Sequence, residues 1–491
     1  MKTQLGLLLV VVAVISCGAD NTAGPGDSPG SSTGPGPREP VDAGAPELPD
    51  SGSPITPADA GPSAQADAGT PTASDAGSPI DGGTTRDAGA TLDAGPGPVS
   101  CGRSPDTKRA PFSLLAPLKA AVAAASDAPS REAHVTTFIN DVKTRGGTPL
   151  IDDASDRVAF IYRGRAGRTY SVAGAWTNWT PTLAMQRLGA TDLWFVETTL
   201  TRSAPHEYKI VDDTSAWLED RLAQNVAWDG MNHYTVGEFN AVARPENWDA
   251  AKGRLVAWRG FPSTTLSNAR DVYIYVPATY DNAACPSLPS LYFHDGNESL
   301  TRSPFAASAD TAYASNPASS AVLVFVALPN QNVRMAEYTF GTTGAKGDAY
   351  GTFLKDELRP AIEARFRVCR DPSDRGLAGA SLGGLIAAYL AFQSPTVWGY
   401  VGSQSGSFFW ADDALITRAG EDPKVGVRFY LDHGCPGDNC AENRDINTKL
   451  VGKGYEVKHI EESGAQHDWA YWQRRLPGLL NYFREGRTGC R

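Results

Sequence analysis

The chain has 491 residues, more than one ordinary domain needs, so we expect two or three units, some of which need not fold. Its net charge is −11, and residues 18–100 carry nearly all of that excess, with 12 acidic and 2 basic side chains. The rest of the chain has no basic excess, which argues against a nucleic-acid-binding protein.

Residues 1–17 have the layout of a bacterial secretory signal. A basic start precedes an apolar stretch, Leu5–Ile15, that is too short to span a membrane. Val14-Ile15-Ser16-Cys17 is similar to a lipobox, in which the cysteine is acylated before cleavage. We therefore expect an exported lipoprotein, anchored through Cys17 on the periplasmic or cell-surface side of a membrane. An ordinary cleaved signal is the alternative.

Residues 18–100 consist mainly of Pro, Gly, Ala, Ser, Thr and Asp. Such a segment cannot bury enough apolar surface to offset its chain entropy, so we expect a disordered linker. Six cysteines follow, an even number that fits up to three disulfides in an exported chain, and Cys435 and Cys440 are the most favoured local pair. No C-x-x-C motif or histidine at ligand spacing accompanies them, so we expect no metal and no cofactor.

Residues 101–157 are expected to form a helical lead-in, with helices at 112–125 and 130–145 and Ser130 as the N-cap of the second. Residues 158–245 change to short alternating runs separated by turn residues, which predicts a β-sandwich. The expected strands are 158–162, 169–173, 193–196 and 207–211.

The segments 174–179, 185–187 and 206–217 resemble the glycogen-binding and isoamylase-type early-set module. In its sugar-binding relatives, two tryptophans and a lysine meet the carbohydrate, and the matching positions here are Trp179, Trp217 and Lys209. Flat indole faces suit stacking on sugar rings. The alternative is that these tryptophans belong to the sandwich core.

Residues 250–491 alternate strands with helices, which predicts an α/β fold with a doubly wound sheet and an antiparallel pair at its start. The expected strands are 254–258, 272–276, 289–294, 322–328, 376–379, 399–403, 427–432 and 455–461, and the expected helices are 350–366, 382–393, 443–453 and 469–484.

A G-x-S-x-G motif at Ser381 follows an expected strand and opens the long apolar helix 382–393. This is the strand-turn-helix setting of the nucleophile elbow of α/β-hydrolases. A second copy, at 30–34, lies in the expected linker and has no such setting. We therefore predict that Ser381 is a nucleophile.

A serine nucleophile needs a base, and the base needs an acid that orients it. His467 lies in a loop after the last strand, whereas His459 falls inside a strand and His433 precedes the acids of the following loop, Asp438 and Glu442. His467 is therefore the expected general base. The loop after strand 427–432 offers three acids, with Asp438 preferred and Glu442 and Asp432 as alternatives.

Acyl transfer also requires backbone donors for the developing oxyanion. The Leu382 N–H, directly after the nucleophile, is one expected donor. The Asn297 N–H, after the strand that ends near His294, is the other.

Four motifs together resemble the esterase D and enterochelin esterase family of α/β-hydrolases. They are Tyr292–Asn297, Arg334 with Glu337-Tyr338, Gly379–Gly384, and Gly464–Trp472. The resemblance implies a serine esterase that acts through an acyl-enzyme on a siderophore of the enterochelin type or on a feruloylated or acetylated carbohydrate. It also implies that Arg334, Glu337 and Trp472 line the substrate site, although Arg334 and Glu337 could equally pair with each other. The competing hypothesis is a non-catalytic, surface glycan-binding lipoprotein that retains this fold.

Overall fold

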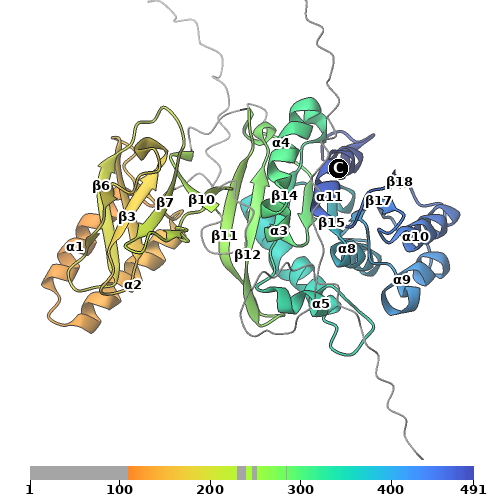
Figure 1. Ribbon diagram of the computed structural model, residues 1–491, viewed down its shortest axis with the longest axis horizontal. Helices are drawn as coiled ribbons and strands as arrows, with labels where there is room; N and C mark the ends of the chain where they lie inside the picture. The colour runs from red at the N-terminus through yellow and green to blue at the C-terminus, as the bar shows by residue number, and fades with distance from the viewer. Residues whose placement is uncertain (1–108, 229–238, 246–250, 283–284, 491) are drawn as a thin grey trace, which may run out of the picture. The chain divides into compact units, whose positions relative to one another are not determined.

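The computed structural model describes residues 109–228, 239–245, 251–282 and 285–490 (Figure 1). The expected signal, Cys17 and the linker therefore lie outside the described residues. Among the described residues, no helix is both long enough and apolar enough to cross a membrane.

Two helices open the described chain, α1 (Leu115–Ala124) and α2 (Ala128–Thr144). The predicted N-cap of α2 at Ser130 is wrong. Asp127 caps the helix, because its carboxylate accepts the Ser130 N–H at 2.7 Å, three residues into the turn.

The next segment contains two antiparallel sheets that share an apolar core. The first sheet has the order β1-β2-β6-β5, and the other strands here pair as β4-β3-β7-β10-β9, with β8 beside β7. Their bounds are β1 Leu150–Ile151, β2 Arg157–Arg163, β3 Tyr170–Gly174, β4 Leu183–Ala184, β5 Gln186–Arg187, β6 Leu193–Thr199, β7 His206–Asp212, β8 Trp217–Leu218, β9 Asn225–Trp228 and β10 Phe239–Ala243. The identity of this segment as an early-set module stays a prediction.

Strand β2 is buried on both of its faces, which explains its unbroken apolar run. Val158 and Phe160 pack with the second sheet around Val172. Their neighbours Ala159 and Ile161 pack against α1 and α2 instead. Successive side chains of a strand point to opposite faces, so the helices and the second sheet together cover both sides of β2.

The second sheet continues into the C-terminal part, because β9 pairs antiparallel with β11 through Val226 and Leu255. From β11 the strand order is β11-β12-β14-β13-β15-β16-β17-β18. Strands β11 and β12 form the antiparallel pair expected at the start and run side by side in Figure 1, and β13 to β18 pair in parallel. The bounds are β11 Arg254–Ser263, β12 Asn268–Val276, β13 Ser290–Phe293, β14 Val322–Val326, β15 Arg375–Ala380, β16 Tyr400–Gln404, β17 Arg428–Cys435 and β18 Val457–Ser463.

Helices cover both faces of this sheet, which confirms the α/β class and the doubly wound arrangement. One apolar core joins the sheet to α6–α10, and a second core joins its other face to α4 and α11. The bounds are α3 Gly296–Thr301, α4 Phe305–Ser315, α5 Arg334–Glu337, α6 Gly347–Thr352, α7 Arg359–Arg365, α8 Leu382–Gln393, α9 Trp410–Glu421, α10 Cys440–Gly452 and α11 Trp469–Arg484. A π-helical segment, Phe353–Leu358, joins α6 to α7 without a break, so the helix expected at 350–366 is a continuous helix with a π-helical middle.

Candidate active site

Ser381 occupies the turn between β15 and α8, at the carboxyl end of a central parallel strand. Its backbone has φ 60° and ψ −124°, a conformation that a non-glycine residue adopts only where its surroundings enforce it. The Ser381 N–H donates to the Gln404 carbonyl at 2.9 Å, and the Ser407 N–H donates to the Ser381 carbonyl at 3.1 Å. These bonds to the segment after β16 hold the serine in the strained turn.

The glycines around Ser381 are required by close backbone contacts. A Cβ on Gly379 would lie 2.8 Å from the Gly383 carbonyl carbon, and one on Gly384 would lie 2.4 Å from Ser403 Oγ. A larger residue at 379 would force strand β15 and helix α8 apart, and one at 384 would collide with Ser403 on β16. The G-x-S-x-G-G pattern is therefore explained by packing in the elbow.

His467 lies just before α11, and its Nδ1 is 2.7 Å from Asp438 Oδ1. Asp468 caps α11 by accepting the Ala470 N–H, which fixes where the helix begins and hence where the His467 loop ends. Because a carboxylate only accepts, the proton lies on Nδ1, and Nε2 carries the lone pair that a general base needs. The structure thus joins His467 to Asp438, the preferred acid among the three candidates.

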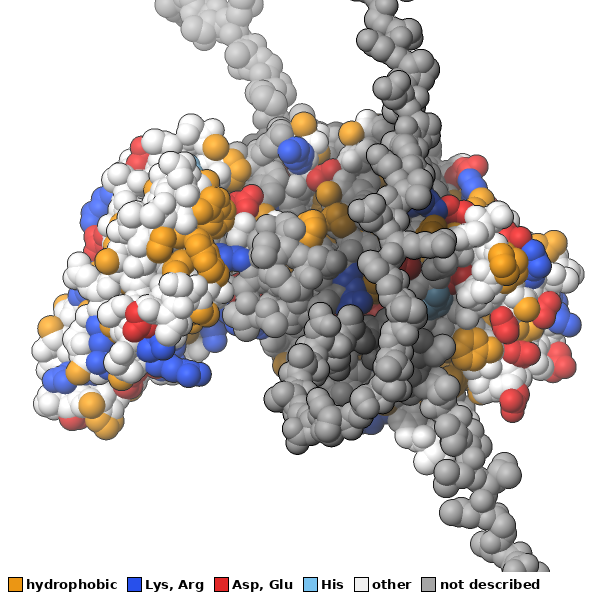
Figure 2. Space-filling view, in the orientation of Figure 1, with side chains coloured by type: hydrophobic (Ala, Val, Ile, Leu, Met, Phe, Trp, Pro, Cys, Tyr) orange, Lys and Arg blue, Asp and Glu red, His pale blue; other side chains and the backbone are white. Residues whose placement is uncertain are grey.

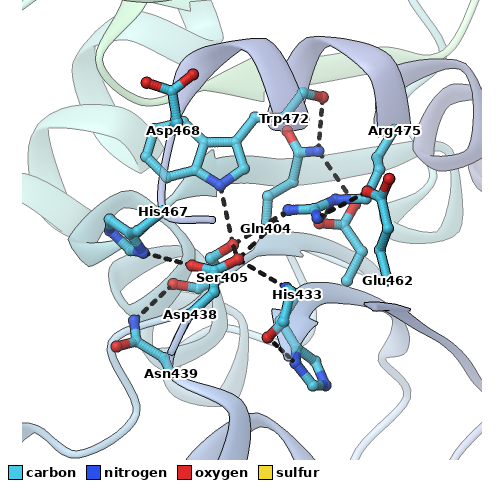
Figure 3. Close-up of polar contacts among 12 residues, drawn as sticks. Gln404, Ser405, His433, Asp438, Asn439, Glu462, His467, Asp468, Trp472 and Arg475 are labelled. Carbon is cyan, nitrogen blue, oxygen red and sulfur yellow. Dashed lines mark hydrogen bonds and ion pairs between the residues drawn. The ribbon is translucent and has the colours of Figure 1, made fainter. Parts of the chain in front are cut away.

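Asp438 is inaccessible to solvent but well supplied with donors. Its Oδ2 accepts the Gly434 N–H and the Ser405 hydroxyl, each at 2.7 Å (Figure 3). Burial alone would raise the pKa of Asp438, but the hydrogen bonds from His467, Ser405 and Gly434 outweigh it and hold that pKa below its usual value. The carboxylate is therefore ionised at neutral pH.

The loop that carries Asp438 is closed by a disulfide between Cys435 and Cys440, which confirms that expected pair. A second disulfide joins Cys369 to Cys490, and Cys285 is also disulfide-bonded. The short bridge limits the freedom of the segment that carries Asp438.

The two alternative acids lie elsewhere. Glu442 is in the first turn of α10 and Asp432 is buried inside β17. The Asp432 carboxylate accepts from Gln404 Nε2 at 3.0 Å and lies 2.8 Å from Arg475 Nε. Burial raises the pKa of Asp432 to about 6, although Arg475 acts in the opposite direction. Asp432 thus binds Gln404 and Arg475 within the core and is not the partner of His467.

Arg475 and Trp472 connect helix α11 to this cluster, as Figure 3 shows. Arg475 Nη2 donates to Ser405 Oγ at 3.2 Å, and Nη1 reaches Glu462 at the same distance. The Trp472 indole N–H donates to Ser405 Oγ at 2.9 Å. Trp472 is 5% exposed and stands edge-on to the His467 ring, so it packs against His467 rather than lining an open site as the resemblance implied.

The loop after β13 approaches the start of α8, where both expected oxyanion donors lie. A Cβ on Gly383 would meet Asp295 Oδ2 and His294 Cβ at 3.3 Å, so these two segments are in contact. Leu382 is the first residue of α8, where a backbone N–H has no acceptor within its own helix. Asn297 is the second residue of α3.

Arg334 and Glu337 do not pair with each other. The Arg334 guanidinium makes two bonds of 2.8 Å to the Asp295 carboxylate, which fixes the loop after β13. Glu337 is buried and makes two bonds of 2.9 Å to Arg270. The implied place of Glu337 on the substrate surface is therefore corrected: its carboxylate is committed to a buried ion pair. Arg334 remains one quarter exposed and stays a candidate for substrate contact.

His294 has a structural environment. It is buried, and its Nδ1 lies 2.9 Å from the Tyr350 hydroxyl. Burial, with a smaller effect from Arg334, lowers the pKa of His294 to about 3. The imidazole is therefore neutral, and the hydrogen bond to Tyr350 fixes it at the end of β13.

The Ser381 hydroxyl contacts Ser407 Oγ at 3.3 Å, and within the described chain no hydrogen bond joins it to His467. Catalytic hydrogen bonds are often long before substrate binds and shorten in the complex. Ser405, Ser407 and Arg475 are the residues of this site that sequence reasoning missed. The only signal for the two serines was their position just after strand β16.

Trp179 and Trp217 are 37% and 40% exposed, with ring centroids 6.2 Å apart. Figure 2 shows hydrophobic side chains gathered over a face of the N-terminal strands. Lys209 departs from the expectation, because it is 6% exposed and so does not share the open surface of the two indoles.

Residues 263–483 match the model of the Esterase family, described as "Putative esterase". The chain is similar to the uncharacterized protein YbbA of Bacillus subtilis, with 28% identity in an alignment that covers 43% of this chain and 85% of YbbA. It is also similar to an iron(III) enterobactin esterase of Dickeya dadantii, with 24% identity in an alignment that covers 70% of this chain and 91% of the esterase. A third alignment, with 25% identity, covers 28% of this chain and 18% of an endo-1,4-beta-xylanase/feruloyl esterase of Xylanibacter ruminicola. Residues 263–483 are thus similar to the esterase family, and together with the fold this similarity supports an enterochelin esterase-like α/β-hydrolase domain and a carboxylic-ester hydrolase.

Proposed function

We propose that this protein is an exported serine esterase that hydrolyses its substrate through an acyl-enzyme. The observation that supports this most directly is the 2.7 Å bond between His467 Nδ1 and the buried Asp438, on the same sheet edge as the strained Ser381. This bond leaves His467 Nε2 free to accept a proton from a serine hydroxyl.

In the proposed reaction Ser381 Oγ attacks the ester carbonyl while His467 takes its proton. The Leu382 and Asn297 N–H groups stabilise the oxyanion, and His467 returns the proton to the departing alcohol. Water, activated by the same histidine, then hydrolyses the acyl-enzyme. Asp438 stabilises the imidazolium that forms in both steps.

Labelling with a fluorophosphonate probe tests the nucleophile. We expect covalent labelling of the wild-type chain and none of Ser381→Ala, whereas Ser407→Ala keeps a labelled serine. Equal labelling of the wild type and Ser381→Ala would show that another residue reacts. No labelling of the wild type would favour the non-catalytic alternative.

For the substrate we propose an enterochelin-type siderophore or a feruloylated or acetylated carbohydrate. The named activities of two relatives, an iron(III) enterobactin esterase and an endo-1,4-beta-xylanase/feruloyl esterase, support the siderophore and the feruloyl ester. Turnover of ferric enterobactin, methyl ferulate and acetylated xylan by the wild type separates them. Hydrolysis of the glycan-linked esters alone would exclude a siderophore as the substrate.

A second function, docking to glycans, is favoured by the exposed pair of Trp179 and Trp217. Stacking of sugar rings on these indoles predicts that Trp179→Ala weakens retention on polysaccharide gels and leaves the hydrolysis of soluble esters unchanged. Trp258→Phe, a change at a partly buried indole, is the control. Equal retention of Trp179→Ala and wild type would exclude this function.

We further propose that the chain is a lipoprotein anchored at Cys17. In a bacterial host, incorporation of labelled palmitate and recovery in the membrane fraction should both be lost in Cys17→Ala. Release of the wild-type chain into the soluble fraction would contradict the anchor.

A further inference from the structure

His433 and His459 meet across the parallel strands β17 and β18. Their Nε2 atoms are 2.9 Å apart and their rings are nearly parallel, with an angle of 28° between the planes. His433 is buried, whereas His459 is partly exposed at the edge of the sheet. Neither imidazole takes part in the proposed reaction.

Glu461 adds a carboxylate on the same side. It lies two residues beyond His459 on β18, so both side chains point to one face, and the register of the sheet sets it opposite His433. Glu461 Oε2 is 3.9 Å from His433 Nε2. His459 and Glu461, on the neighbouring strand, thus both lie next to the Nε2 atom of His433.

The orientation of His433 is fixed on its far side. Its Nδ1 lies 3.0 Å from the Gly434 carbonyl, and because a carbonyl only accepts, Nδ1 carries the proton. The lone pair of Nε2 is therefore directed at His459. A backbone carbonyl that holds one nitrogen while the other presents a lone pair is the arrangement of metal-ligating histidines.

We propose that His433, His459 and Glu461 form a binding site for a divalent transition-metal ion of the zinc class, bound by two imidazole nitrogens and one carboxylate oxygen. Nitrogen and oxygen donors of this kind suit zinc, with metal–nitrogen distances of about 2.0–2.1 Å. In a tetrahedral site two such nitrogens lie about 3.3 Å apart, so the rings need to separate by only a few tenths of an ångström. The exposed edge of β18 leaves room for a water ligand.

Two neighbours shape this site. Cys440 Sγ lies within 4.8 Å of the His433 and Glu461 donors, but its disulfide with Cys435 prevents it from acting as a thiolate ligand. Arg444 makes two bonds of 2.6 Å to the Glu461 carboxylate and brings a positive charge. Arg444 therefore opposes the metal, and the affinity of the site depends on it.

Calorimetric titration with Zn²⁺, and the visible absorption of bound Co²⁺, test the proposal on a chain purified without a histidine tag or reductant. We expect one ion per chain. His459→Gln should weaken binding by more than about tenfold, since even the loss of an outer partner of a metal ligand costs 10–100-fold in affinity. His206→Gln, a histidine on β7, should leave binding unchanged.

Arg444→Gln gives a result of the opposite sign, because releasing Glu461 from the guanidinium should tighten binding. Thermal melting without metal establishes that each variant is folded, and if His433→Gln is not, the edge variant His459→Gln decides the question. The proposal is overturned if the wild type binds no ion, or if His459→Gln binds as tightly as wild type. Weaker or unchanged binding by Arg444→Gln would overturn the coordination by Glu461.

Discussion

The Ser405 hydroxyl donates its single hydrogen to Asp438 Oδ2 across 2.7 Å. The direction follows from its other two neighbours, the Trp472 indole and the Arg475 guanidinium, which can only donate. Helix α11 therefore contacts Asp438 through one serine, while the loop before the same helix carries His467. Asp438 Oδ1 is left for His467.

Replacing Ser405 by alanine should lower kcat/KM by about tenfold, because a hydrogen bond to a charged group is worth about 1.5–3 kcal/mol. Loss of the donor should also raise the pKa of Asp438, so the acid limb of the kcat/KM profile should move to higher pH. Ser403→Ala, two residues earlier on β16 and equally buried, is the control and should keep the wild-type profile. A variant at 405 with an unshifted acid limb would show that the hydroxyl only fills space.

Asp432 should make stability depend on pH in an unusual direction. Its folded pKa of about 6 exceeds its unfolded value, so the folded state binds the proton more tightly and Asp432 favours folding as pH falls through 6. Between pH 7 and pH 5 the wild type should gain about 1 kcal/mol relative to Asp432→Asn in the free energy of unfolding. Denaturant titrations of both proteins at the two pH values measure this difference. A constant difference would mean that Arg475 keeps Asp432 ionised throughout.

The two described disulfides should separate stability from activity. The double variant Cys435→Ser/Cys440→Ser opens a short loop, and in the chain-entropy model it should lower the free energy of unfolding by about 2 kcal/mol. It also frees the segment that holds Asp438, so kcat/KM should fall. Cys369→Ser with Cys490→Ser opens a loop with a sequence separation of 121, and should cost about 5 kcal/mol with little change in kcat/KM. The reverse ranking in activity would exclude a positioning role for the short bridge.

The sequence predicted best those elements whose ends carry local signals. Helices α8 and α11 begin and end at the expected residues, because a glycine-bounded turn starts the first and the Asp468 cap starts the second. Helices α4 and α9 were not singled out, since small and polar residues interrupt the apolar pattern of each.

Some residues of the candidate site could likewise be predicted from local sequence signals, whereas their contacts could not. Strand-turn-helix context pointed to Ser381, and loop position pointed to His467 and Asp438, but the choice among three acids needed the distance from Asp438 to His467. The partners of Glu337 and Arg334 could not be read from spacing, because they lie on β12 and in the loop after β13, which only the fold brings near. The two histidines at the sheet edge are hidden for the same reason, as they are 26 residues apart.

Gly379→Ala tests whether the elbow must be compact. The added Cβ would lie 2.8 Å from the backbone of Gly383, which cannot rotate away, so β15 and α8 must separate. Overpacking of this kind costs about 1–3 kcal/mol, and the same movement displaces Ser381 from its turn. We expect loss of fluorophosphonate labelling together with reduced stability. Gly426→Ala, where a Cβ meets nothing within 4 Å, should change neither quantity. Full labelling of Gly379→Ala would mean that the elbow tolerates a wider turn, and that the glycine contributes only to packing.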